Sequence, residues 1–249
     1  MADQSELHAS DDTNAAIWKS DEGISHWVAT QDERERRRVE HRRMLADLLP
    51  FADDEAFNFL DLGAGTGAAA GTILSRFAHA TAVLADFSPQ MMEEGQRALA
   101  PFAGRYRYVE LDMAGGQWPE ELAGPFDAAV SSLCVHHLPD DRKASLFAEI
   151  GERLRPGGWY LNYDPVAADE PLVAEAWERA GDRQDPDAAH TRANRTPEEQ
   201  RRWENHVRYI TPLGPQIQWL RQAGFVGVDV YWKQLDHVIY GGCRPLETS

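Results

Sequence analysis

An acidic residue and three glycines stand together in the segment DLGAGTG, which begins at Asp61 and follows the apolar run FNFL. Glycines let a loop backbone lie directly against a ligand. Gly63, Gly65 and Ala68 fit the dinucleotide pattern G-x-G-x-x-G/A, and Asp86 lies at about the right distance. The carboxylate of Asp61 would repel a pyrophosphate at the next helix N-terminus, and it favours a ligand with an ammonium or sulfonium charge. A P-loop is excluded because no Gly-Lys-Ser/Thr follows.

A second group of reactive side chains comes later in the chain. His136 and His137 stand in CVHHLPD, and Tyr163 and Asp164 end the run WYLNYD. One imidazole could act as a general base, with Asp164 at the same rim, although packing of at least one histidine against the sheet is the favoured interpretation. A metal site can be assembled on paper from both histidines, Asp164 and His206. Their spacing matches no metal motif, so we predict no metal.

Alternating strands and helices must position these side chains. The pattern predicts strands over residues 57–62, 81–86, 105–111, 126–133 and 159–164, and helices over 31–49, 68–78, 89–100 and 141–154. Such alternation is typical of βαβ units and of a parallel sheet that is covered on both faces. The carboxyl ends of the strands then meet at one edge, where open α/β proteins bind ligands.

The alternation stops at Pro165. Residues 166–210 are charged, and we expect two helices around the loop GDRQDPDAAHTRAN, the second opened by the capping-box sequence TPEE. Thr211 is expected to cap a further helix that ends at Gly224. Two strands follow, with a short connection around Lys233 and Gln234 that forces an antiparallel hairpin. We predict one domain over residues 1–249, with a helical insertion over 166–210.

The motifs taken in order resemble a known family. DLGAGTG is similar to motif I of the class I S-adenosylmethionine-dependent methyltransferases. ADFSPQMM and ELDM follow at the expected places, and FDAAVSSLCVHHLPD, LRPGGWYLNYD and the terminal YGGCR resemble the bacterial small-molecule and ubiquinone-type branch. The resemblance covers roughly residues 57–164 and 211–244. It implies a Rossmann-like α/β fold with a seven-stranded, mostly parallel sheet whose last strand is antiparallel.

The resemblance also implies the cofactor S-adenosyl-L-methionine, with S-adenosyl-L-homocysteine as product. Asp61 would hold the methionine ammonium, directly or through water, and Asp86 would accept two hydrogen bonds from the ribose hydroxyls. Phe87 and Met113 would pack on the adenine, and Asp112 would accept from its amino group. The full set of cofactor residues that it implies is Asp61, Gly63, Ala64, Gly65, Gly67, Asp86, Phe87, Met91, Asp112, Met113, Ser131 and Ser132, the two serines lying beside the methyl group.

Charge and composition bear on the partners. The chain has 41 acidic and 25 basic side chains and a formal charge of −16, which opposes binding to a phosphate backbone. The run RERRRVEHRR from Arg34 to Arg43 could form an RNA-binding face, but interleaved acidic residues favour a solvated helix. With two cysteines far apart and no long apolar run, we expect a cytoplasmic protein, monomeric or homodimeric, without nucleic-acid or membrane partners.

The function predicted from the sequence is direct in-line methyl transfer to a small-molecule acceptor. A tRNA-modifying methyl or carboxymethyl transferase and a non-catalytic S-adenosylmethionine-binding module are the alternatives. Residues 1–50, with Trp18 and Trp27, are expected to form an N-terminal helical lid, and residues 166–210 a roof over the acceptor. The candidate contacts of this roof are Trp177, His190, Arg195, Trp203 and His206.

Overall fold

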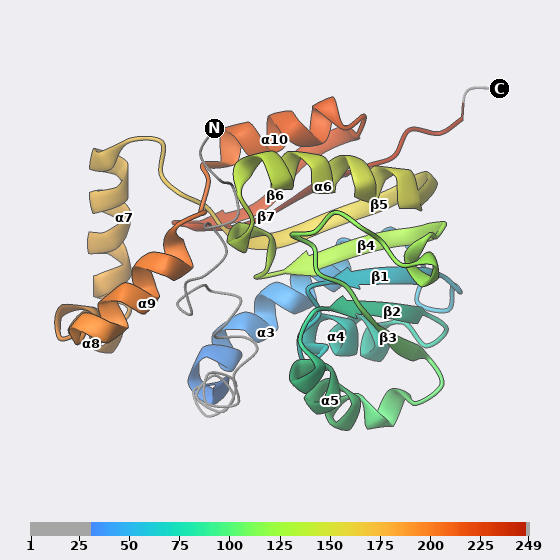
Figure 1. Cartoon of the computed structure of the whole chain (residues 1–249), viewed down its shortest axis with the longest axis horizontal. Coiled ribbons are helices and arrows are strands. Elements are labelled where there is room, and N and C mark those ends of the chain that lie inside the picture. Colours follow the sequence, from blue (N-terminus) through green and yellow to red (C-terminus); the bar gives the residue numbers. More distant parts are fainter. Residues whose placement is uncertain (1–30, 248–249) are drawn as a thin grey trace, which may run out of the picture.

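Residues 31–247, which the computed structural model describes, form a seven-stranded sheet in the order β3-β2-β1-β4-β5-β7-β6 (Figure 1). The strands are β1 (Asn58–Leu62), β2 (Thr81–Asp86), β3 (Tyr106–Glu110), β4 (Phe126–Ser132), β5 (Leu154–Pro165), β6 (Val226–Gln234) and β7 (His237–Cys243). Neighbouring strands run parallel except β7, which is antiparallel to both β5 and β6. The predicted fold class, including the terminal hairpin, is confirmed.

Helices cover both faces of the sheet, which makes three layers (Figure 1). They are α3 (Gln31–Asp47), α4 (Ala68–Arg76), α5 (Pro89–Ala98), α6 (Asp140–Arg153), α7 (Pro171–Gln184), α8 (Pro186–Ala193), α9 (Pro197–Val207) and α10 (Leu213–Gln222). Helices α6 and α10 pack on one face over a core that includes Phe147, Tyr160 and Leu220. On the other face, α3 and α4 contribute Leu45 and Ile73 to a second core.

Local signals explain several of these elements. The hydroxyl of Ser88 accepts a hydrogen bond from the Met91 backbone N–H, and Pro89 stands at the first position of α5, as predicted. In α6 the apolar positions Phe147 and Ile150 are fully buried against the sheet. The burial of this helical stripe, rather than intrinsic propensity, is what stabilises a helix of this length.

The insertion differs from its prediction. Within residues 166–210, all of which are described, three helices form instead of two, because the segment expected to be a loop contains α8. Asp185 caps this helix by accepting from the Ala188 backbone N–H at 3.0 Å, and Pro186 occupies its first position. The predicted capping box of Thr196 and Glu199 is confirmed at the start of α9. Figure 1 shows α7, α8 and α9 projecting beyond the carboxyl edge of the sheet.

Three further boundaries are corrected. Thr211 does not cap α10; its hydroxyl instead binds the Lys143 ammonium and the Asp140 carboxylate. Strand β5 begins at Leu154, so the RPGG segment lies inside the strand, where a register irregularity against β4 accommodates it. Strand β6 extends through Gln234, which moves the hairpin turn later than the sequence predicts.

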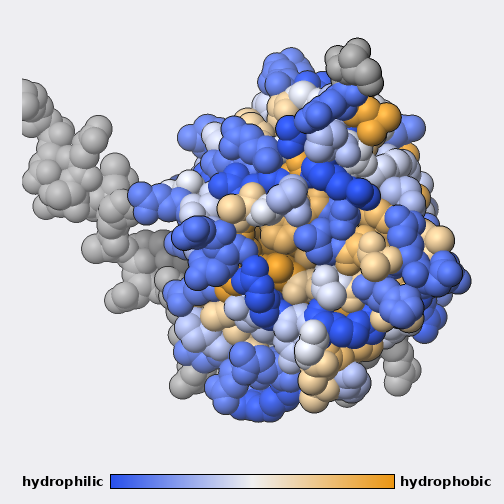
Figure 2. All heavy atoms as spheres, turned by 90° about the vertical axis from the view of Figure 1, so that its right-hand side faces the viewer, coloured by the Kyte–Doolittle hydropathy of each residue, from blue (hydrophilic) through white to orange (hydrophobic). Residues whose placement is uncertain are grey.

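Figure 2 shows that the face at the amino ends of the parallel strands is mainly hydrophilic, with apolar side chains in small scattered areas. Every helix within residues 31–247 is too short or too polar to cross a membrane. Trp18 and Trp27 of the predicted lid lie outside the described residues, as do the side chains of residues 31–37 in the arginine-rich run.

Candidate active site

The glycine loop between β1 and α4 has a backbone that only glycine adopts easily. Gly63, Gly65 and Gly67 have φ values of 64°, 53° and 73°, all in the left-handed region. The N–H groups of Gly63 and Ala64 donate to the Ala85 carbonyl at the end of β2, at 2.9 and 3.1 Å. A Cβ on Gly63 would lie 2.5 Å from the side chain of Cys134. The loop is therefore fixed at the carboxyl edge of the sheet with its backbone against its neighbours.

Asp61 lies beneath this loop at the end of β1 and is 1% exposed. One carboxylate oxygen accepts from the Ala70 backbone N–H at 3.1 Å, while the other is buried and has no hydrogen-bond partner among residues 31–247. Burial raises the pKa of Asp61 to about 7, and the neighbouring Asp86 carboxylate adds to the rise. A buried carboxylate with an unsatisfied oxygen is costly unless a donor or cation approaches it. This observation fits the ammonium group that the resemblance assigns to Asp61.

Asp86 joins the end of β2 to the loop. Its carboxylate accepts from the Gly65 N–H at 2.7 Å through one oxygen and from the Ser88 N–H at 2.9 Å through the other. Burial raises the pKa of Asp86, and the hydrogen bonds from Ser88 and Gly65 oppose that rise. Each carboxylate oxygen has a second acceptor position. The backbone N–H of Phe87 also bonds to this carboxylate, which keeps some acceptor capacity for a ligand hydroxyl while it holds the loop.

The other predicted cofactor residues are arranged around the same loop. A Cβ on Gly65 would lie 3.1 Å from the terminal methyl of Met91, and one on Gly63 would lie 3.2 Å from that of Met113. The exposed Asp112 accepts from the Ala114 backbone N–H at 2.9 Å, which shapes the turn after β3. Phe87, directly after Asp86, is half-buried. Residues from the ends of three strands are therefore brought together as the sequence predicts, although their individual contacts with the cofactor stay predictions.

The side chain of Ser131 is engaged inside the sheet. It is fully buried, and its hydroxyl binds the Asn162 side chain and lies 3.4 Å from the Tyr160 hydroxyl. Asn162 in turn donates to the Tyr240 hydroxyl at 2.8 Å. This polar network crosses β4, β5 and β7 inside the core, and the predicted place of Ser131 beside the methyl group stays a prediction. Side chains alternate along a strand, and Ser132 therefore points to the opposite face, where its predicted role stays open.

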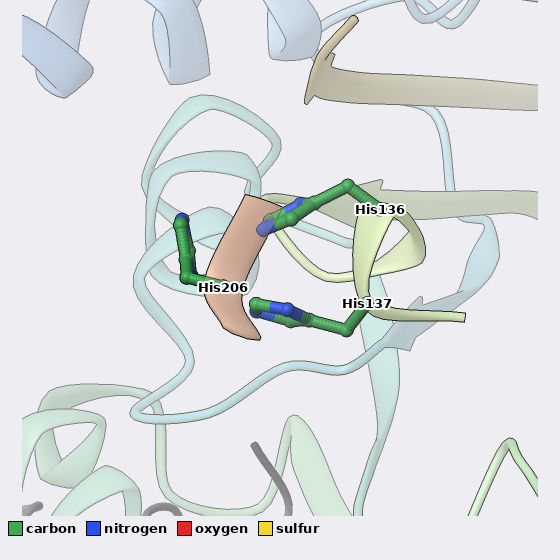
Figure 3. Close-up of side chains that lie close together, drawn as sticks. All are labelled: His136, His137 and His206. Atoms are coloured by element: carbon green, nitrogen blue, oxygen red, sulfur yellow. The ribbon is translucent and has the colours of Figure 1, made fainter. Parts of the chain in front are cut away.

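The two histidines after β4 occupy a short 3-10 helix, η4 (Val135–His137), and they meet a third histidine on α9. The ring centroids are 3.9 Å apart for His136 and His137, 5.1 Å for His136 and His206, and 5.0 Å for His137 and His206. Figure 3 shows the two rings of η4 extending toward His206. The structure thus brings His136, His137 and His206 together, although their spacing in the sequence matches no metal motif.

Asp164, at the end of β5, holds the first of these rings. Its carboxylate accepts from the His136 backbone N–H at 2.8 Å and contacts His136 Nδ1 at 2.6 Å. His136 is 3% exposed, and its Nε2 is buried with no hydrogen-bond partner in the described part of the chain. Burial lowers the pKa of His137 to about 2, and the proximity of the basic side chains of His136, His206 and Lys143 lowers it further. His137 is therefore a neutral imidazole at physiological pH.

Sequence reasoning missed two residues that shape this region. The Tyr108 hydroxyl donates to the Gly65 carbonyl at 3.0 Å and fixes the glycine loop from β3. Lys143 is fully buried in α6 and binds the Tyr209 carbonyl, where the insertion returns to the core. A signal for Lys143 was present, because it stands at helical spacing with the buried Leu146, Phe147 and Ile150. Nothing comparable marks Tyr108, whose partner is distant in sequence.

The predicted roof residues separate into groups. Trp177 lines a cavity of about 430 Å³ between α7, α10 and β6, and the residues that line this cavity do not include the glycine loop. The Lys233 ammonium lies 3.9 Å from the Trp177 ring centroid. Trp203 lies 5.9 Å from the His206 ring and carries the Arg195 guanidinium at 4.2 Å. The fifth predicted residue, His190, is exposed on α8, and the side-chain amide of Asn194 contacts its ring.

Comparisons with known proteins identify the central part of the chain. Residues 59–158 match the methyltransferase domain family. Trans-aconitate 2-methyltransferase of Deinococcus radiodurans is 33% identical over 99 residues, which are 40% of this chain and 34% of that protein. Demethylmenaquinone methyltransferase of Clavibacter sepedonicus is 31% identical over 119 residues, 48% of this chain and 45% of that one. The matched segments thus span about a third to a half of these curated relatives.

The fold itself has a close structural parallel. The O-methyltransferase family protein from Burkholderia thailandensis superposes with a TM-score of 0.67 at 14% identity, covering 96% of this chain and 65% of that one. The strand order and this superposition show that the chain has the fold of that O-methyltransferase family protein. The domain match over residues 59–158 and the two partial relatives support a class I S-adenosylmethionine-dependent methyltransferase of the bacterial small-molecule type.

Proposed function

We propose that this protein transfers the methyl group of S-adenosylmethionine to a small-molecule acceptor. The observation that carries the proposal is the buried, unpartnered carboxylate oxygen of Asp61 beneath the glycine loop. Together with Asp86 at the end of β2, it offers an ammonium site and a diol site on adjacent strands. Nicotinamide dinucleotides carry a pyrophosphate near this position and would be repelled by Asp61.

Bound S-adenosylmethionine supplies an electrophilic methyl group on a sulfonium sulfur. The glycine loop and Asp86 would hold the nucleoside, and Asp61 would fix the methionine end, so that the methyl group points toward the turn after β4. In-line displacement needs little besides alignment, and positioning can contribute most of the rate enhancement. On the acceptor side, Asp164 fixes the ring of His136, whose Nε2 has a lone pair directed away from that carboxylate.

The acceptor is proposed to lie beneath the insertion. Helix α9 contacts the histidine turn through His206, so part of the insertion already covers this edge. Trans-aconitate and demethylmenaquinone, named for two relatives, are the first acceptors to test, with release of S-adenosylhomocysteine as the readout. A net charge of −16 leads us to expect no retention of the protein on RNA at physiological salt.

The raised pKa of Asp61 predicts a pH dependence of cofactor binding. The affinity for S-adenosylhomocysteine should rise about tenfold between about pH 6 and about pH 8, because only the ionised carboxylate pairs with the ammonium. Its ionised fraction grows from about one tenth to about nine tenths across that window when the pKa is about 7. Isothermal titration calorimetry over this pH range measures the effect. An affinity that is flat across the window would contradict the assigned role.

Asp61→Asn provides the matched variant, because asparagine keeps the shape and one acceptor oxygen. It should remove most of the pH dependence and weaken binding at pH 8. It should also stabilise the ligand-free protein at neutral pH. A folded-state pKa raised above the ordinary 3.8 means that the free energy of unfolding of the wild type falls as the pH rises from about 4 to about 7. Thermal unfolding at about pH 8 checks this sign.

A further inference from the structure

The cluster of His136, His137 and His206 has the dimensions of a metal site. Three ligand atoms, one from each ring, lie within 4.8 Å of one another. In a tetrahedral zinc site with nitrogen ligands at about 2.0–2.1 Å, the nitrogens are about 3.3 Å apart. The rings would therefore need to approach by at most about 1.5 Å, which side-chain rotation can supply. The rings come from two segments, η4 and α9, and the two rings of η4 extend toward the segment that carries His206 (Figure 3).

Asp164 prepares one of these rings for ligation. A carboxylate can only accept, so the hydrogen between Asp164 and His136 belongs to Nδ1 of the imidazole. Nε2 then carries a lone pair, and this atom is buried without a hydrogen-bond partner in the described structure. A carboxylate–histidine pair with the other ring nitrogen directed to the metal is the usual outer-shell arrangement of histidine metal sites.

A simple stack of imidazole rings explains the geometry less well. Such a stack leaves His136 Nε2 desolvated with nothing to satisfy it, which costs free energy, whereas a metal ion accepts that lone pair. The third ring is also held in place. Lys143 binds the carbonyl of Tyr209, three residues after His206, and so anchors the end of α9 to α6. The positive charge of Lys143 lies near the carboxylates of Asp140 and Asp164, which offset it.

We propose that His136, His137 and His206 bind a divalent first-row transition metal ion, such as Zn²⁺, with Asp164 orienting His136. Imidazole ligands suit these ions, and three protein ligands leave a coordination position open. If the proposed methyl transfer is correct, that position faces the acceptor and would take an anionic oxygen of it. The metal site itself stands on the histidine geometry and does not depend on that reaction.

Titration of the chelator-treated full chain with Zn²⁺ tests the site without cofactor or acceptor. We expect one Zn²⁺ per chain, and Co²⁺ as a second probe should give the visible absorption of a low-coordinate site. His206→Ala, on the half-buried side of α9, should weaken Zn²⁺ binding by at least about a hundredfold, and Asp164→Asn by about tenfold to a hundredfold. His190→Ala removes an exposed histidine of the same insertion and should leave the affinity unchanged.

Two results would overturn the proposal. One is the absence of stoichiometric Zn²⁺ binding by the wild-type chain. The other is an equal Zn²⁺ affinity in the wild type and in the variants His206→Ala and His137→Gln. Circular dichroism shows which of the two variants is folded, and the comparison uses the folded one. Because these measurements need no methyl transfer, failure of the metal site and failure of the proposed function are distinguishable.

Discussion

Replacing Asp86 by alanine is expected to weaken binding of S-adenosylhomocysteine by about tenfold to a hundredfold. The change removes the proposed charge-assisted acceptors of the ribose hydroxyls, worth on the order of 1.5–3 kcal/mol. It also removes the acceptor of the Gly65 N–H, which leaves the glycine loop without one of its fixed points. Calorimetry at constant pH and salt gives the ratio of dissociation constants.

Two further variants separate these contributions. Asp86→Asn retains one acceptor oxygen and the volume, so its loss should lie between those of wild type and Asp86→Ala. Glu93→Ala removes an exposed carboxylate on the following helix, which pairs with Arg97 at the surface, and should bind as the wild type does. Equal affinities of wild type and Asp86→Ala would show that this carboxylate serves the loop or the helix cap and not the cofactor.

Removing the insertion should abolish methyl transfer while cofactor binding survives. The connections in the structure refine which residues to replace. Ala167 forms a bridge with Pro212, and its N–H donates to the Thr211 carbonyl at 3.2 Å, so the two ends of the insertion lie side by side. A short Gly-Ser linker in place of residues 168–208 closes this gap and retains the Tyr209 carbonyl that Lys143 binds.

In this variant we expect an S-adenosylhomocysteine affinity within about threefold of wild type, because the proposed cofactor residues all precede the insertion. Methyl transfer should fall by at least about a hundredfold, because the acceptor would no longer be enclosed. The acceptor in this assay is whichever of trans-aconitate and demethylmenaquinone the wild type converts. Leu172→Ser, at a side chain 76% exposed on α7, is the surface control. Transfer at a comparable rate without the insertion would contradict the proposed roof.

The sequence was sufficient for the sheet because its signals are local. Strands β1 and β2, for example, are short apolar runs that end just before Gly63 and just before the Ser88 helix cap, and the short connection after Gln234 permits only an antiparallel hairpin. It failed where the signals are weak or ambiguous. Helix α8 was not predicted because its polar residues are typical of a loop, although Asp185 followed by Pro186 is a signal for the start of a helix.

In the candidate site, too, the residues of a local motif were predicted, while the contacts that depend on tertiary packing were not. The glycine loop and Asp86 follow a motif whose spacing fixes their place in three dimensions. The hydrogen bond between Ser131 and Asn162 was not predicted, because the position of Ser131 at the end of β4 does not show which face of the sheet its side chain takes. The meeting of His136 and His206 depends on the packing of α9 against η4, across many residues of chain, and no local pattern encodes that contact.

Calorimetric titration of the purified full chain with S-adenosylmethionine, S-adenosylhomocysteine and NAD tests the central claim most directly. In the proposed site Asp61 would bind the ammonium and Asp86 the diol, and glycines with left-handed backbone conformations form the loop above them. We expect both sulfur ligands to bind one per chain and NAD to produce no measurable heat. Binding of NAD more tightly than either sulfur ligand would contradict it.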